Sequence, residues 1–202
     1  VLSLRARRTD LMRDIPDVEY EPNAAFVGED ARYYRASGTS FAAPIVAGVA
    51  SLLLSADPSL TNVEVERMLT QSARDIEHPG RDQYTGYGLV DARAALAADP
   101  GFYLTVAVHG VSVVSGDDGQ AVRVAGTLDA DDLRGGRVEL GAGETPDAWE
   151  PVLTGIGRVR DGALGDIPAE RFRGSPVWTL RLVGEHADGT TREARFLLRL
   201  GG

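Results

Sequence analysis

The spacing of hydrophobic residues changes at Pro100-Gly101, and this change constrains the fold more than any other feature of the sequence. Before it, apolar residues recur at helical spacing. After it, apolar and polar residues alternate in short runs, as in Leu104, Val106 and Val108. A Pro-Gly pair interrupts both helices and strands. We therefore expect two domains, residues 1–100 and residues 101–202.

The second half predicts an all-β domain. About seven short strands fit its alternating runs, and Asp188-Gly189 is a typical hairpin turn between the last two. Trp178, Leu180 and Leu182 share one face of the earlier strand of that hairpin. This pattern favours an immunoglobulin-like β-sandwich. It resembles the immunoglobulin- and fibronectin-type modules appended to secreted bacterial enzymes, which implies a spacer, stabilising or adhesion role.

The first half contains one helix whose apolar residues cover every face. The run from Phe41 to Leu54 has no polar stripe, and such a helix is normally buried inside a larger body. The rest of this half is too small to cover it, so we expect a missing partner portion. The run is about 14 residues, which is too short to cross a bilayer, and we expect no membrane span.

Two further helices have clear start signals. Thr61 and Glu64 fit a capping box, and the segment behind them is amphipathic through Val63, Val65, Met68 and Leu69. Asp91 is a predicted N-cap for a short Ala-rich helix. The segment from residue 5 to 35 is mostly charged and predicts a surface loop with short extended pieces.

Composition excludes several chemistries. The absence of cysteine rules out disulfides, zinc–thiolate sites and cysteine nucleophiles. All 21 basic residues are arginine, so a Ser–Lys dyad cannot form. The net charge of −9 argues against a nucleic-acid partner. We predict no metal site: the acidic clusters Asp129–Asp132 and Asp117-Asp118 are interpreted as solvated turns, with calcium binding as the alternative.

Ser40 directly precedes the apolar helix and has two interpretations. It is either an N-cap or a nucleophile. Gly38-Thr39 allows a sharp turn, and a helix that begins at about Ser40 directs free N–H groups toward a reacting centre. The backbone N–H of Ser40 is therefore a candidate oxyanion donor. Pro44 is compatible with the helix because it lies near the start.

The string around Ser40 resembles the nucleophile signature of the subtilisin-like serine peptidases, the subtilases. The matching positions are Gly38, Thr39, Ser40, Ala42, Pro44, Val46, Ala47 and Gly48. The resemblance extends over about residues 1–98. It implies the carboxyl-terminal part of a doubly wound α/β fold, mostly helical in this chain. It also implies that Ser40 is the nucleophile.

The same resemblance implies that essential partners lie elsewhere. Subtilases place the Asp and His of the triad and the oxyanion Asn before the serine. His78, His109 and His186 all follow Ser40, and none lies in a family-like motif. Asn23 does not match the oxyanion position either. We therefore predict that this chain alone does not hydrolyse peptides.

The favoured interpretation is part of an exported serine endopeptidase, extracellular or periplasmic, that acts on proteins or peptides. A start at Val1 in a strand-like segment suggests a fragment or a processed product, with the other part in the same precursor or in a separate chain. No cofactor is expected in this chain, although the complete peptidase domain would be compatible with calcium. The alternative is a non-catalytic binding or structural protein, in which a degenerate peptidase body carries the β-sandwich.

Overall fold

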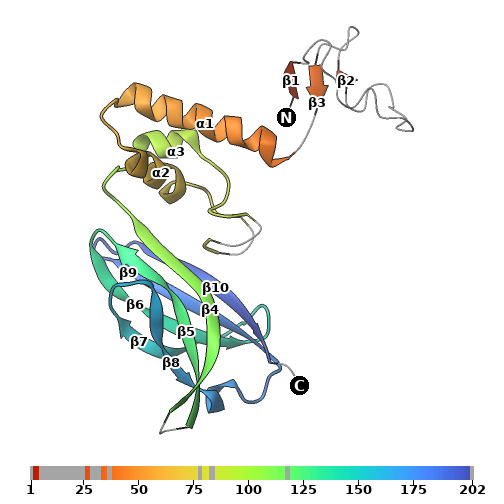
Figure 1. Ribbon diagram of the computed structural model, residues 1–202, viewed down its shortest axis with the longest axis vertical. Helices are drawn as coiled ribbons and strands as arrows, with labels where there is room; N and C mark the ends of the chain where they lie inside the picture. Colours follow the sequence, from red (N-terminus) through yellow and green to blue (C-terminus); the bar gives the residue numbers. More distant parts are fainter. Residues whose placement is uncertain are drawn as a thin grey trace. The chain divides into compact units, whose positions relative to one another are not determined.

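The computed structural model describes residues 2–4, 26–27, 33–35, 38–76, 79–81, 85–116 and 119–200 (Figure 1). The chain divides into two compact units, Val1–Ser51 and Leu52–Gly202. The boundary between the two units lies within α1 (Thr39–Ala56), the helix that begins directly after Gly38 and contains Ser40. The predicted domain boundary at Pro100-Gly101 stays a prediction.

The first unit begins with a small antiparallel sheet. Its strands are β1 (Leu2–Leu4), β2 (Phe26–Val27) and β3 (Tyr33–Arg35), in the order β1-β3-β2. Strands β2 and β3 are short extended pieces of the kind expected within residues 5–35, and β1 lies in the strand-like start of the chain. Helix α1 follows directly after Gly38.

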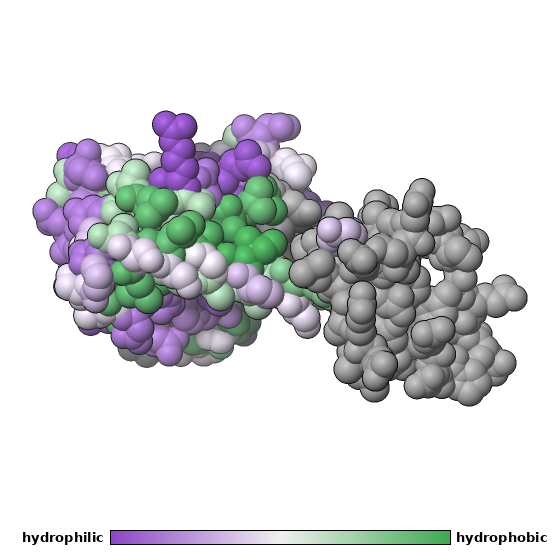
Figure 2. Space-filling model, turned by 90° about the horizontal axis from the view of Figure 1, so that it is seen from above, coloured by the Kyte–Doolittle hydropathy of each residue, from purple (hydrophilic) through white to green (hydrophobic). Residues whose placement is uncertain are grey.

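Helix α1 is largely exposed in this chain, although its sequence predicts burial. Val49 and Leu53 are only 6% and 1% exposed, whereas Ile45 and Leu52 are 50% and 52% exposed. Figure 2 shows hydrophobic residues exposed on the surface that is seen from above. As far as the structure describes the chain, much of the apolar surface of α1 is therefore uncovered.

The expectation that this helix is too short for a bilayer is not supported. It has 18 residues, and a window of that length has a mean hydropathy of 1.7. An 18-residue helix is about 27 Å long, close to the thickness of a hydrocarbon core. The apolar run from Phe41 to Leu54 is shorter than the helix because α1 also includes small and hydroxylic residues at both ends.

The second unit begins with two short helices after α1. Helix α2 (Asn62–Gln71) starts at the predicted capping box: Thr61 N donates to Glu64 Oε2 at 2.7 Å, and Glu64 N donates to Thr61 Oγ1 at 3.3 Å. Helix α3 (Ala92–Ala97) starts at Asp91, whose carboxylate accepts from Ala94 N at 2.9 Å. In the predicted apolar face of α2, Met68 is buried but Val63 is exposed.

Seven strands make up the remainder of the described chain, which we call the β module (residues 104–199). They form two antiparallel sheets, β10-β9-β6-β7 and β4-β5-β8. Their bounds are β4 (Leu104–Gly116), β5 (Gly119–Ala130), β6 (Leu133–Ala142), β7 (Glu150–Ile156), β8 (Val159–Pro168), β9 (Val177–His186) and β10 (Thr191–Arg199). A short 3-10 helix, η1 (Ala169–Phe172), follows β8.

One hydrophobic core lies between these sheets. Side chains from both sheets contribute to it, and the predicted alternation is confirmed at Leu104, Val106, Leu180 and Leu182, all of which are buried in this core. The predicted hairpin at Asp188-Gly189 is also present: it joins β9 to β10, and Gly189 has a φ of 90°. Immunoglobulin-like topology stays a prediction for this module.

The chain as a whole is mainly β-strand, so the expectation of a mostly helical first half needs correction. In the described part of residues 1–100, the three helices have 18, 10 and 6 residues, and the small sheet precedes them. Helical spacing predicted where the helices lie. It did not reveal the short strands, whose pairing depends on residues far apart in the chain.

Candidate active site

Ser40 lies in the exposed first turn of α1. The carbonyl oxygen of Gly38 accepts from Phe41 N at 3.0 Å and from Ala42 N at 3.2 Å, so Gly38 is the residue at which the helix begins. Ser40 is therefore not the N-cap but the second helical residue. Its N–H has no acceptor within the helix, because the residue four positions earlier precedes the helix.

Gly38 makes this geometry accessible. Its φ of 144° lies in the region that favours glycine, and a Cβ atom there would meet only Phe41, at 3.8 Å. Backbone conformation, not space, therefore requires glycine before Thr39. The positive end of the α1 dipole and the first-turn N–H groups lie beside the Ser40 side chain. This arrangement is suited to an anion or to a developing oxyanion.

We expected Pro44 near the start of the helix, where proline is tolerated. It lies further inside α1 than that. It is the sixth helical residue, where an N–H would normally donate to the carbonyl of Ser40. The helix nevertheless continues to Ala56. Pro44 therefore deprives the Ser40 carbonyl of its usual helical donor, while the Ser40 N–H also has no helical partner.

In both histidines that the structure describes, the two ring nitrogens lie near polar groups of the β module. In His109, Nδ1 lies 3.0 Å from Asp161 Oδ1, and Nε2 lies 3.3 Å from Thr127 Oγ1. In His186, Nδ1 and Nε2 contact two different carboxylates. His78 and Asn23 lie outside the described residues. The role of Ser40 as a nucleophile stays a prediction.

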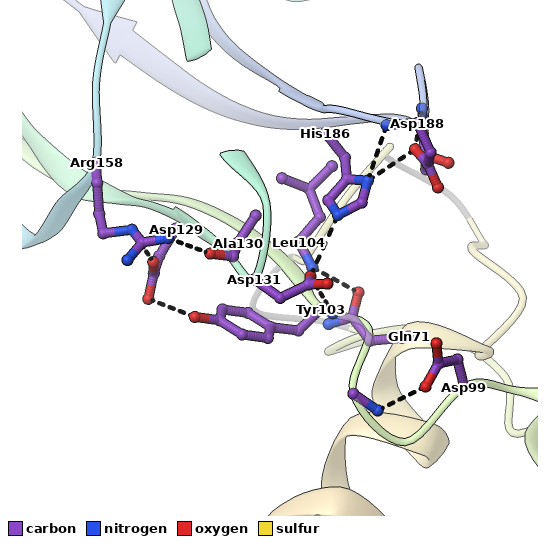
Figure 3. A network of polar contacts seen from close by, with 12 residues as sticks. Gln71, Asp99, Tyr103, Leu104, Asp129, Ala130, Asp131, Arg158, His186 and Asp188 are labelled. Carbon is purple, nitrogen blue, oxygen red and sulfur yellow. Dashed lines mark hydrogen bonds and ion pairs between the residues drawn. The ribbon is translucent and has the colours of Figure 1, made fainter. Parts of the chain in front are cut away.

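His186 is the centre of a buried polar network in the β module (Figure 3). Its Nδ1 lies 2.8 Å from Asp188 Oδ1, and its Nε2 lies 3.3 Å from Asp131 Oδ1. The hydrogen bond to Asp188 raises the pKa of His186; burial opposes this effect, and the charges of both carboxylates reinforce it. The carboxylates lie at opposite ends of the ring, so this group does not converge on one metal ion.

The acidic cluster Asp129–Asp132 is only in part the solvated turn that its sequence predicts: Asp131 and Asp132 form an exposed turn, whereas Asp129 lies on β5. Asp129 is buried and pairs with Arg158 at 2.9 Å and with Arg160 at 2.6 Å. Asp131 accepts from Tyr103 N at 2.9 Å. The arginines that neutralise Asp129 lie about 30 residues away in the sequence, so local composition did not reveal them. Asp117 and Asp118 lie outside the described residues.

No metal centre is present among the described side chains. No group of three or more His, Asp or Glu residues in that part of the chain is placed to hold an ion. Calcium binding by a complete peptidase domain stays a prediction. Sequence reasoning also did not identify Arg192 or Gln71, which connect α2 to the β module.

Comparison with known proteins agrees with the resemblance at Ser40. Residues 26–88, which include α1 and α2, match the model of the subtilase family. The halolysin-like extracellular serine protease Nep of Natrialba magadii is 48% identical over 68 residues, 34% of this chain. The minor extracellular protease Epr of Bacillus subtilis is 40% identical over 62 residues, or 31% of this chain, and the autotransporter lipoprotein NalP of Neisseria meningitidis is 42% identical over 66 residues, or 33%.

These matches concern a small part of each relative. The chain covers 12% of the length of Nep, 10% of Epr and 6% of NalP. The family match ends at residue 88, before the β module begins. The similarity therefore describes the segment around Ser40.

Proposed function

Residues 26–88 are a subtilisin-like segment, and on this premise we propose that the chain is the carboxyl-terminal part of an exported serine endopeptidase whose nucleophile is Ser40. One observation carries the proposal. Ser40 is exposed in the first turn of an apolar helix, directly after a glycine with a φ of 144°, inside the family-matched segment. Export is supported by the word "extracellular" in the names of Nep and Epr.

In the complete peptidase, Ser40 Oγ attacks the carbonyl carbon of the scissile peptide bond. A histidine outside this chain accepts the hydroxyl proton and later delivers it to the leaving amine, and an aspartate orients that histidine. The Ser40 N–H donates to the oxyanion, together with an asparagine that also lies outside this chain. This division of the site explains why we expect no peptide hydrolysis by the chain alone.

The exposed faces of α1 support a missing protein layer. Ile45, Val46, Leu52 and Leu54 are exposed large hydrophobic residues on this one helix. Ala47 and Gly48 are small and allow a neighbouring element to approach closely. We propose that the amino-terminal peptidase portion, not a bilayer, covers them. The test is binding of the isolated chain to neutral phosphatidylcholine vesicles. If the amino-terminal portion is the cover, adding it should abolish this binding. Binding that persists would favour a bilayer.

The decisive experiment uses a fluorophosphonate probe on the full-length precursor. We expect stoichiometric labelling that Ser40→Ala abolishes, with loss of peptidase activity by about 10⁴-fold or more. Ser51→Ala is the matched control, since Ser51 is exposed on the same helix and donates only to Ala47 O at 3.0 Å. The 202-residue chain alone should not be labelled. Rapid labelling of the isolated chain would contradict the proposed division of the site.

The alternative is a degenerate peptidase body whose useful part is the β module. A full-length precursor that resists the probe while remaining folded would favour this alternative. Sequencing the region before Val1 gives an independent answer, because the alternative requires loss of the triad Asp or His there.

A further inference from the structure

The carboxyl end of α2 receives a cation from the far end of the chain. A guanidinium nitrogen of Arg192, on β10, donates to the carbonyl oxygen of Gln71, the last residue of α2. Helix α2 has no basic residue in its own last turn. Since the last carbonyls of a helix lack helical donors and form its negative end, Arg192 supplies both the donor and the charge that α2 lacks.

The neighbouring carbonyls of α2 are satisfied locally. Thr70 Oγ1 donates to Glu66 O at 2.8 Å, and Ser72 Oγ donates to Met68 O at 2.5 Å. Gln71 O instead has a partner from β10, 121 residues away. The end of α2 is thus completed by the β module and not by the peptidase-like segment.

The side chain of Gln71 makes the reciprocal contact. Its Oε1 accepts from the backbone N–H of Leu104 at 3.3 Å, and Leu104 is the buried first residue of β4 (Figure 3). Tyr103, one residue earlier, donates its N–H to Asp131 at 2.9 Å. The connection into β4 is therefore held by α2 on one side and by the His186 network on the other.

Two further contacts extend this junction. The guanidinium of Arg67 on α2 lies 4.2 Å from the centre of the Tyr103 ring. Gly80 packs so closely on β10 that a Cβ atom there would overlap the carbonyl oxygen of Glu193. Helix α2 and the β module belong to the same compact unit, Leu52–Gly202.

Charged side chains line the clefts along this junction. Cavities of about 200 Å³ and 330 Å³ lie along it, the first lined in part by Asp75 and Arg192, the second by Arg67 and Tyr103. Burial lowers the pKa of Arg192, and its Nε has no hydrogen-bond partner. A cation held there at this desolvation cost needs a compensating partner, and the Gln71 carbonyl and the negative charge of Asp75 provide it.

We propose that the β module is an intramolecular brace for the peptidase-like segment: through Arg192 and the Gly80 contact it fixes the carboxyl end of α2, and it is not a freely tethered spacer. This inference goes beyond the proposed peptidase function and does not require Ser40 to be a nucleophile. Its test therefore measures helix protection and not proteolysis.

The test is hydrogen exchange of the 202-residue chain, followed by mass spectrometry at residues 65–72. Arg192→Met should accelerate exchange in this segment about tenfold, the size expected for loss of one hydrogen bond to a charged group. Arg199→Met is the matched control, because Arg199 lies on the same strand but forms an exposed pair with Glu144 at 2.7 Å. The control should leave residues 65–72 unchanged.

A second pair of variants tests the contact between Gly80 and β10 without altering a charge. Gly80→Ala should separate the 79–81 segment from β10. Because Gly80 N donates to Asp75, whose charge acts on Arg192, the same α2 amides should exchange faster. Gly86→Ala is its control: both glycines have positive φ values, 89° and 63°, but a Cβ atom at Gly86 meets nothing within 4 Å. Both variants introduce backbone strain, but only Gly80→Ala also disturbs the contact with β10. Comparing them therefore separates the two effects.

Amides of β9 report whether the β module stays folded. Faster exchange at residues 65–72 in Arg192→Met and Gly80→Ala, with β9 and the controls unchanged, supports the brace. Equal acceleration at residues 65–72 and in β9 indicates general unfolding of the unit and overturns it. Unchanged exchange at residues 65–72 in both variants overturns it, including the case in which β9 alone loses protection. Equal acceleration in the two controls would also overturn it.

Discussion

The carboxylate of Asp188 lies 2.8 Å from Nδ1 of His186, at the hairpin that joins β9 to β10. This contact and the one to Asp131 raise the pKa of His186. A raised folded pKa means that the stabilising contribution is complete below the unfolded pKa of about 6.5 and is lost as pH rises through the folded value. We expect the free energy of unfolding to fall over this range, measured by urea denaturation between about pH 6 and pH 9.

His186→Gln should remove this pH dependence. His109→Gln is the control, since His109 is more exposed and lies on β4, away from the hairpin. A wild-type slope that survives in His186→Gln would assign the pH dependence to another group. Asp131 and Asp188 do not interfere in this window, because their pKa values are lowered and their contributions are lost only on acidification.

Glu139 is a buried carboxylate between two arginines, and its neutralisation should destabilise the β module. Its side chain is 7% exposed and lies 2.8 Å from Arg137 and 2.5 Å from Arg181. Burial alone would raise the pKa of Glu139, but the hydrogen bonds and charges of both arginines lower it overall. Glu139→Gln should reduce the free energy of unfolding by about 3 kcal/mol, because it leaves two cations without their shared partner.

The matched control for Glu139 is Glu150→Gln. Glu150 pairs with Arg171 at 2.7 Å, but both side chains are well exposed. Exposed pairs contribute little, so this change should cost less than about 1 kcal/mol. Chemical denaturation followed by tryptophan fluorescence measures both variants. Equal effects would show that burial of Glu139 has no energetic consequence.

The capping box of α2 should contribute measurably to its stability. Thr61→Ala removes the oxygen that accepts from Glu64 N and should cost about 1 kcal/mol. Thr70→Ala, within the same helix, removes only back-bonds to Glu66 O and Arg67 O and should be neutral or slightly favourable. Circular dichroism during urea denaturation compares the two. A Thr61→Ala variant as stable as Thr70→Ala would contradict this role.

Gly38 should control the start of α1. Gly38→Ala places a side chain at a φ of 144° and should cost about 1–3 kcal/mol locally. The amides of Phe41 and Ala42, which donate to Gly38 O, should then exchange at least about tenfold faster. Gly48→Ala lies within the helix, where alanine is favoured and a Cβ atom meets nothing within 4 Å. It should leave these amides unchanged; acceleration there instead would contradict the assignment.

Local signals in the sequence predicted local structure well. The capping box at Thr61, the N-cap at Asp91 and the hairpin at Asp188-Gly189 are all present where the sequence places them. Each depends on residues within a few positions of one another, so backbone preference and side-chain reach decide them. The alternation of apolar residues likewise predicted which side chains enter the core of the β module.

The candidate site shows where such prediction ends. The motif from Gly38 to Gly48 marked Ser40, and the structure places Ser40 in the first turn of α1, two residues past Gly38, so Ser40 is not the N-cap that the simpler interpretation required. The same motif predicted a buried helix, yet its faces are exposed in this chain. Burial depends on what surrounds a helix, and residues 37–54 do not encode that.

By itself, the sequence determined the helix starts, the strand faces and the serine motif, because these follow from short-range spacing and composition. Only the tertiary structure decided the partners of charged and polar groups. It paired Asp129 with Arg158 and Arg160, placed two carboxylates around His186, and brought Arg192 to Gln71 across 121 residues. Such pairings depend on which strands and helices become neighbours, and the free energy that selects them is shared over the whole fold.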